Sequence, residues 1–78
     1  MFFKIKNDDV KAFVKQFERM RNQISYSEFC LIELLTNLAI DNGSMSFSAI
    51  KKKLNVNTEE LAKNINRLIE MDLFEFDL

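Results

Sequence analysis

The chain has 78 residues, of which 47% are hydrophobic, and a formal net charge of -1. These values exclude a long disordered tail and leave room for one small domain. The absence of Pro, the single Gly and the single Cys exclude a turn-rich sheet architecture and an internal disulfide framework. No apolar run approaches the roughly 20 residues that cross a bilayer, so we expect one soluble, cytoplasmic domain over residues 1–78 with no membrane partner.

The first predicted elements are a short extended segment and an amphipathic helix. Residues 1–7 alternate loosely between apolar and basic side chains, as extended backbone does. Asn7 or Asp8 is expected to cap a helix that continues to about Gln23. Apolar residues recur along this helix three and four positions apart, as in a heptad seam: Val10, Phe13, Phe17, Met20 and Ile24. The seam packs either within the domain or against a second copy of the chain, so a homodimer through this helix stays open.

The second predicted helix is the most hydrophobic segment of the chain. It runs from Tyr26 to Ile40 and is apolar on nearly every side, so we expect it to be the central and most buried element. Ser25 and Glu28 have the spacing of a capping box, in which each side chain accepts from the backbone amide of the other. Gly43 is expected to end the helix in a left-handed conformation.

A helix-turn-helix is predicted over about residues 46–70. Its first helix, Phe47–Leu54, is expected to begin at a Ser46 cap, and its second helix, Thr58–Glu70, at an Asn57 cap. The three residues between the helices are too few for anything but a sharp change of direction. Two helices joined in this way cross at a wide angle.

The last predicted element is a strand over Phe74–Leu78, where apolar and acidic residues alternate strictly. Met45 is expected to supply a one- or two-residue strand that pairs with it. If an edge of this strand stays open, it can pair with another chain, so Phe74–Leu78 is also a candidate protein-binding edge. The expected fold class is therefore mainly α, with four helices, a helix-turn-helix and a short C-terminal β-strand.

Positive charge is distributed unevenly along the chain. Residues 1–24 carry six basic and three acidic side chains, and residues 51–67 carry five basic and two acidic ones. The segments 25–50 and 68–78 carry acidic side chains and no basic ones. The basic residues thus gather on the first helix and on the helix-turn-helix, as a surface that faces nucleic acid would require.

The order of these elements resembles the winged helix-turn-helix of MarR-type regulators. Within that group, residues 24–29 (ISYSEF) and the Lys-rich helix Phe47–Leu54 are most similar to the staphylococcal accessory regulators, the Sar branch. The resemblance covers about residues 10–76 and implies a minimal winged-helix domain that lacks a complete wing. It also implies a small transcriptional regulator that binds duplex DNA as a homodimer, with residues 58–69 as the recognition helix. Where the family usually has Gly after this helix, the chain has Asp72, which tolerates left-handed backbone.

The resemblance implies roles for exposed residues of both helices. Asn66 would contact adenine and Arg67 guanine, while Thr58 and Lys63 would contact phosphate. The lysines of the preceding helix would reach the DNA backbone across the groove. The candidate DNA-binding residues are Lys51, Lys52, Lys53, Thr58, Lys63, Asn66 and Arg67.

The sequence predicts no enzyme and no cofactor or metal site. It has no His, no Gly-rich phosphate loop and no pair of cysteines or carboxylates at metal-ligand spacing. Two alternatives to a transcriptional regulator stay open. One is a protein-interaction winged helix, an adaptor or an inhibitor of a host complex, which would use the acidic strand edge and the N-terminal seam. The other is a single-strand DNA-binding accessory protein of a mobile element.

Overall fold

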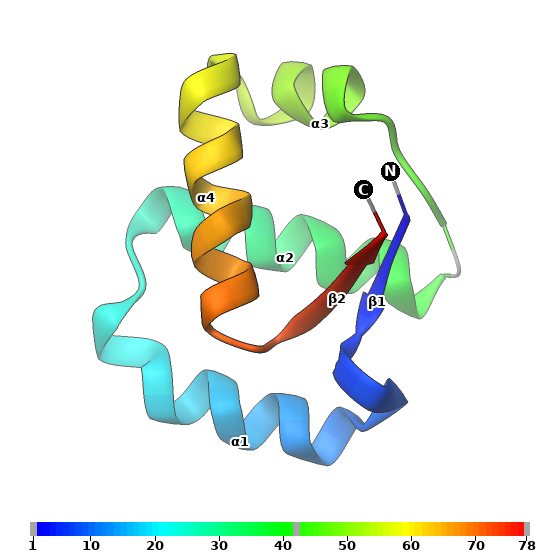
Figure 1. Ribbon diagram of the computed structural model, residues 1–78, viewed down its shortest axis with the longest axis vertical. Coiled ribbons are helices and arrows are strands. Elements are labelled where there is room, and N and C mark those ends of the chain that lie inside the picture. The colour runs from blue at the N-terminus through cyan, green and yellow to red at the C-terminus, as the bar shows by residue number, and fades with distance from the viewer. Residues whose placement is uncertain (1, 42, 78) are drawn as a thin grey trace.

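The computed structural model describes residues 2–41 and 43–77 of the chain. Over these residues, four α-helices lie between two short strands that pair with each other (Figure 1). This confirms the mainly helical fold class and the C-terminal strand; Met1 and Leu78, which belong to the two predicted extended segments, lie outside the described residues. The elements are β1 (Phe2–Ile5), the 3-10 turn η1 (Lys6–Asp8), α1 (Val10–Met20), the 3-10 turn η2 (Arg21–Gln23), α2 (Tyr26–Ile40), α3 (Phe47–Leu54), α4 (Thr58–Glu70) and β2 (Phe74–Asp77).

The sheet joins the two ends of the described chain. β1 and β2 run antiparallel, with Phe3 opposite Phe76 and Ile5 opposite Phe74. The predicted pairing of the C-terminal strand with Met45 is wrong, since residues 43–46 lie in no strand. β1 takes that place because its alternating apolar residues supply cross-strand partners for the two phenylalanines, which one isolated methionine cannot do.

The negative charge on the outer face of the sheet is partly neutralised by Lys4. Lys4 lies opposite Glu75, and its Nζ is 3.4 Å from Glu75 Oε2 and 3.6 Å from Asp8 Oδ2. The hydrogen bond to Glu75, together with the nearby Asp8 carboxylate, raises the pKa of Lys4. The acidic side of β2 therefore already has a cation of its own chain beside it.

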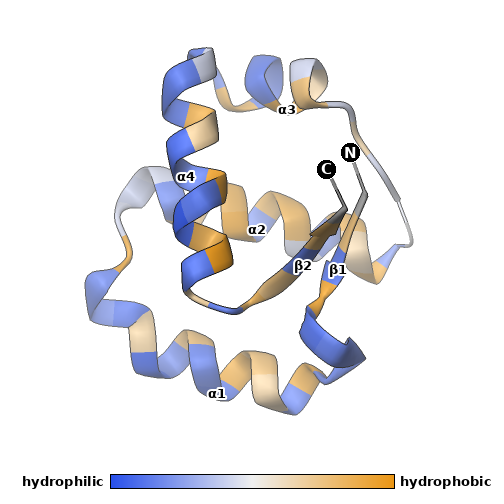
Figure 2. Cartoon of the chain, in the orientation of Figure 1, coloured by the Kyte–Doolittle hydropathy of each residue, from blue (hydrophilic) through white to orange (hydrophobic). Residues whose placement is uncertain are grey.

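The core forms where α2, α4 and the sheet meet. Figure 2 shows hydrophobic residues along α2 and on the inner side of α4, with hydrophilic residues on the outer side of α4. α2 is central as predicted, but only along one face, because Tyr26 and Ile40 are 83% and 67% exposed. A domain this small has too few elements to cover a helix on all sides. The buried apolar residues are Ile5, Leu31, Ile32, Leu35, Ile50, Leu61, Ile65, Leu68, Met71, Leu73 and Phe74.

α1 is shorter at both ends than the sequence indicates. Asp9 caps it, accepting the backbone N–H three residues on at 3.0 Å, so the predicted caps Asn7 and Asp8 are wrong. Both of those residues have a positive φ in the turn that leaves β1, and that turn delays the start of the helix. The α-helix ends at Met20, and a 3-10 turn continues to Gln23.

The other predicted helix starts are confirmed. Ser25 and Glu28 form the reciprocal capping box, and Ser46 and Asn57 each accept a backbone N–H of the first helical turn. α3 ends at Leu54, and the left-handed backbone of the next residue, Asn55 (φ 54°), reverses the chain before α4. Short polar side chains at these positions supply bonds that the first amides of a helix lack.

The backbone conformations of two turn residues, Gly43 after α2 and Asp72 after α4, can be compared with the sequence analysis. Gly43 has no positive φ, so its expected left-handed conformation is wrong; its N–H instead donates to the carbonyl of Leu38 at 2.7 Å. Asp72 has a φ of 60° and leads from α4 into β2, so it adopts the left-handed backbone that Asp tolerates. Within the described part of the chain, no helix is long and apolar enough to cross a membrane.

Candidate nucleic-acid interface

α3 and α4 form the predicted helix-turn-helix with the predicted bounds. α3 lies across the N-terminal end of α4, and three residues join them (Figure 1). Val56, in the turn, packs against the core, and Leu61 in the first turns of α4 is fully buried. Lys51 Nζ donates to Thr58 Oγ1 at 3.1 Å, which ties the two helices together near the turn. The pair is therefore held both by apolar packing and by a polar contact on its surface.

The outward face of α4 is open but mixed in charge. Thr58, Lys63 and Asn66, three of the predicted contacts on this helix, are exposed. The same helix carries Glu59 and Glu70, which are exposed as well. Side chains on this face can therefore reach a polar surface, but α4 alone does not attract a polyanion.

Arg67, the fourth predicted contact on α4, is held by carboxylates of the domain. Its Nε lies 3.5 Å from Glu28 Oε2, and its Nη1 lies 3.7 Å from Glu70 Oε2. The other oxygen of Glu28 accepts the Ser25 N–H at 2.9 Å, so this carboxylate is fixed at the start of α2. Arg67 therefore anchors α4 to α2 in this structure. Its spacing in the sequence could not reveal this, because Glu28 belongs to another helix.

A second polar contact between α2 and α4 was also missed. Asn64 is buried on the apolar side of α4, and its Nδ2 donates to Ser27 Oγ at 2.7 Å. Ser27 Oγ in turn donates to Glu60 Oε1 at 3.1 Å. A polar residue between Leu61 and Ile65 on the buried stripe is the sequence signal that could have indicated such a bond. These two polar contacts set the position of α4 on the first turns of α2.

The cationic part of the site is α3. Lys52 and Lys53 are exposed and Lys51 is half-buried. Among the described residues, none of the three forms an ion pair with a carboxylate. A shallow hollow of about 600 Å³ lies beside Lys51 and Lys52, and five of its seven lining residues have polar side chains: Ser46, Ser48, Ala49, Lys51, Lys52, Asn55 and Val56. Lysines without carboxylate partners suit contacts with phosphate groups.

The predicted seam of α1 lies mostly within the domain. Phe13, Phe17, Met20 and Ile24 are half-buried against the core. Val10, the fifth seam residue, is 60% exposed. Four of the five seam residues therefore lie partly against the protein's own core, while Val10 and also Val14 (50% exposed) on the same helix stay exposed.

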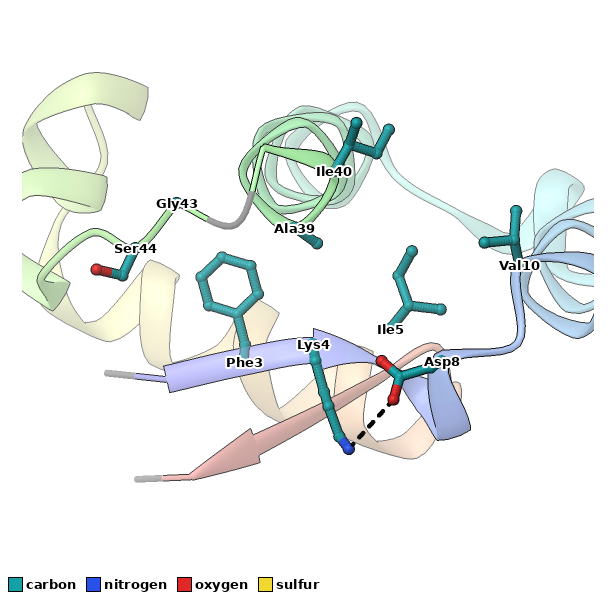
Figure 3. A pocket seen from close by; sticks show the side chains of 9 residues that line it. All are labelled: Phe3, Lys4, Ile5, Asp8, Val10, Ala39, Ile40, Gly43 and Ser44. Carbon is teal, nitrogen blue, oxygen red and sulfur yellow. Dashed lines mark ion pairs between the residues drawn. The ribbon is translucent and has the colours of Figure 1, made fainter.

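A second hollow lies at the outer edge of β1. It has a volume of about 480 Å³ and lies between this strand and the C-terminal end of α2 (Figure 3). Phe3, Ile5 and Ala39 point into it, and the ion pair of Lys4 with Asp8 lies at its rim. The lining of this hollow is mainly apolar, and the protein-binding edge at Phe74–Leu78 stays a prediction.

The chain was compared with family models, with curated proteins and with solved structures, and no match was found. The chemistry of the site is therefore defined by its own residues. It combines lysines on α3 that have no carboxylate partner among the described residues with an exposed polar helix face on α4. Side chains of these types can contact phosphate groups and the polar groups beside them.

Replacing Arg67 by Ala is expected to lower the free energy of unfolding by about 1–2 kcal/mol, because it leaves the Glu28 carboxylate, only 12% exposed, without its cation. The effect stays below that of a fully buried pair because the Arg67 side chain is 35% exposed. This loss is measured by urea denaturation, with the unfolding monitored by circular dichroism. The neighbouring exposed residue provides the control, since Asn66→Ala should change stability by less than about 0.5 kcal/mol. Unchanged stability in R67A would contradict the anchoring role.

Proposed function

We propose that the protein binds duplex DNA and acts as a small transcriptional regulator. The observation that carries this proposal is the run Lys51–Lys53 on α3, unpaired among the described residues and joined to the exposed polar face of α4 by a three-residue turn. Lysines supply the sequence-independent attraction to phosphate, and an exposed helix face supplies contacts to base edges. The resemblance to MarR-type regulators, in the order of the elements, agrees with this arrangement.

In the proposed complex, α4 lies in the major groove and α3 lies over one phosphate strand. The 13 residues of α4 give it a length of about 20 Å at 1.5 Å per residue, and a groove about 12 Å wide admits one such helix. Asn66 reads adenine, and Lys63 and Thr58 contact phosphate. The contact of Arg67 with guanine stays a prediction, and its ion pair with Glu28 would in addition fix the angle at which α4 is presented.

The test is the salt dependence of duplex binding in K51A/K52A/K53A. Removing three phosphate contacts should lower the slope of log Kd against log salt by about 2.7 and weaken binding to all sequences alike, by roughly 100-fold at low salt. Fluorescence anisotropy with a labelled duplex measures both quantities. Because Lys51 also donates to Thr58, the thermal unfolding of the variant is measured alongside.

The matched control is K51R/K52R/K53R, which keeps the three charges and should retain the salt slope of the wild type. Binding of the same oligonucleotide in single-stranded form distinguishes the regulator from a single-strand accessory protein, and the duplex is expected to bind more tightly. If the alanine variant binds duplex DNA as the wild type does, the proposed orientation is wrong.

A second candidate function is protein interaction, and the hollow beside β1 favours it. Phe3 and Ile5 line this hollow together with Ile40, which is 67% exposed. An extended segment of a partner could pair with the strand and place apolar side chains there. Ile40→Glu should abolish such a contact while leaving salt-dependent DNA binding unchanged, so the two functions can be measured separately.

A further inference from the structure

A basic cluster lies at the opposite end of α4 from the α3 lysines. It surrounds a hollow of about 500 Å³ between α1 and the turn that follows α4, and three of its side chains are cations. α1 passes beneath the C-terminal end of α4, while α3 lies across the N-terminal end (Figure 1). The lining residues are Lys6, Asn7, Ala12, Phe13, Lys15, Gln16, Arg19 and Asp72.

Two contacts hold this hollow in place. Gln16 Nε2, on α1, donates to the carbonyl of Met71 at 2.8 Å, directly after α4 ends. Lys6 Nζ lies 3.2 Å from Asp72 Oδ1, in the left-handed turn that leads to β2. The side of α1 that carries the cations is thus attached to the C-terminal end of the proposed recognition helix.

The charge of the hollow is positive. Lys15 and Arg19 are exposed and lie one helical turn apart, so their side chains project from the same side of α1. In the described structure neither has a carboxylate within ion-pair distance. Lys6 forms an ion pair with Asp72, so the hollow has three cations and one carboxylate. The excess of positive charge suits an anionic ligand such as a phosphate diester.

A helix in the major groove has a phosphate strand on each side of it, and α3 accounts for only one of them. We propose that Lys15 and Arg19, supported by Lys6, bind phosphates of the second strand, so that α4 is held in the groove from both ends. This inference rests on the proposed function, because it assumes that α4 enters the groove. It assigns to α1 a part of the DNA interface that the helix-turn-helix does not contain.

The test compares K15A/R19A with K11A in duplex binding. The double variant should lower affinity about 10- to 30-fold at low salt and reduce the salt slope by about 1.8, with base preference unchanged. Lys11 lies one turn earlier on the same helix and does not line the hollow, so K11A should change affinity less than about 2-fold. Circular dichroism establishes that both variants keep the helical content of the wild type.

Methylphosphonate substitution of single phosphates locates the contact. At some phosphates the substitution should weaken binding by the wild type but not by K15A/R19A, and these phosphates are the contacts of Lys15 and Arg19. They should lie on the DNA strand opposite the phosphates identified in the same way with K51A/K52A/K53A. If K15A/R19A binds as K11A does while the α3 variant is weakened, the second contact is overturned and the proposed function stands. If neither variant is weakened, both are overturned. If the phosphates identified with the two variants lie on the same strand, the proposal that α1 and α3 bind opposite strands is overturned.

Discussion

Leu68→Ala is expected to lower the free energy of unfolding by about 3–4 kcal/mol, the cost of a cavity at a fully buried leucine. Leu68 lies on the inner stripe of α4 with Leu61 and Ile65, which also belong to the core. A domain of 78 residues has a total stability of roughly 4–12 kcal/mol. The variant should therefore be partly unfolded at 37 °C and should have a much lower urea midpoint than the wild type.

Lys63→Ala is the control for this prediction, because Lys63 is exposed on the outer side of the same helix. It should change the free energy of unfolding by less than about 0.5 kcal/mol. A loss below about 1 kcal/mol in L68A would mean that α4 does not pack through this stripe. The outward direction of Asn66 and Lys63, on which the proposed DNA contact depends, would then be wrong as well.

Phe74→Ala is expected to cost about 3–5 kcal/mol, because Phe74 joins the sheet to α1. Phe74 is 3% exposed, and the centroid of its ring lies 5.4 Å from that of Phe13 and 6.4 Å from that of Phe3, both with an edge-on geometry. Such aromatic pairs contribute about 0.5–1.5 kcal/mol beyond the area that they bury. Removing the ring therefore weakens packing in the strand pair and in the helix together.

Hydrogen exchange measures locally how far the loss of the Phe74 ring weakens the strand pair. The Lys6 N–H donates to the Leu73 carbonyl at 3.1 Å, beside the strand pair, and its protection should fall most in the Phe74 variant. Glu75→Ala, on the outer face of the same strand, should cost less than about 1 kcal/mol, because it removes only a surface ion pair whose side chains are 56% and 33% exposed. Equal losses for the two variants would contradict the inward orientation of Phe74.

Local signals in the sequence predicted the helices and their starts well. The bounds of α3 and α4 and the caps at Ser25, Ser46 and Asn57 agree with the structure. Each of these features depends on residues within one helical turn of each other, so the local sequence is sufficient to predict it. The start of α1 was misplaced because Asn7 and Asp8 are equally good caps in isolation and are used instead in the turn after β1.

Contacts between distant segments were not predictable in the same way. The bond between Asn64 and Ser27 joins residues 37 positions apart, and the ion pair of Arg67 with Glu28 joins the same two helices. The hydrophobic pattern indicates which face of a helix is buried, but it does not identify the residue that meets a given polar side chain. For this reason the sequence placed basic residues on the first helix but indicated neither the ion pair of Arg67 with Glu28 nor the hollow between α1 and the turn after α4.

The pairing of β1 with β2 has a consequence for the order of folding. These strands bring residues 2 and 77 together, and closing a loop of that length costs roughly 4 kcal/mol of chain entropy. The contact between α3 and α4 closes over a few residues and costs far less. The helices should therefore assemble before the two chain ends meet, and the strand pair should be the last part to form and the first to open under denaturant.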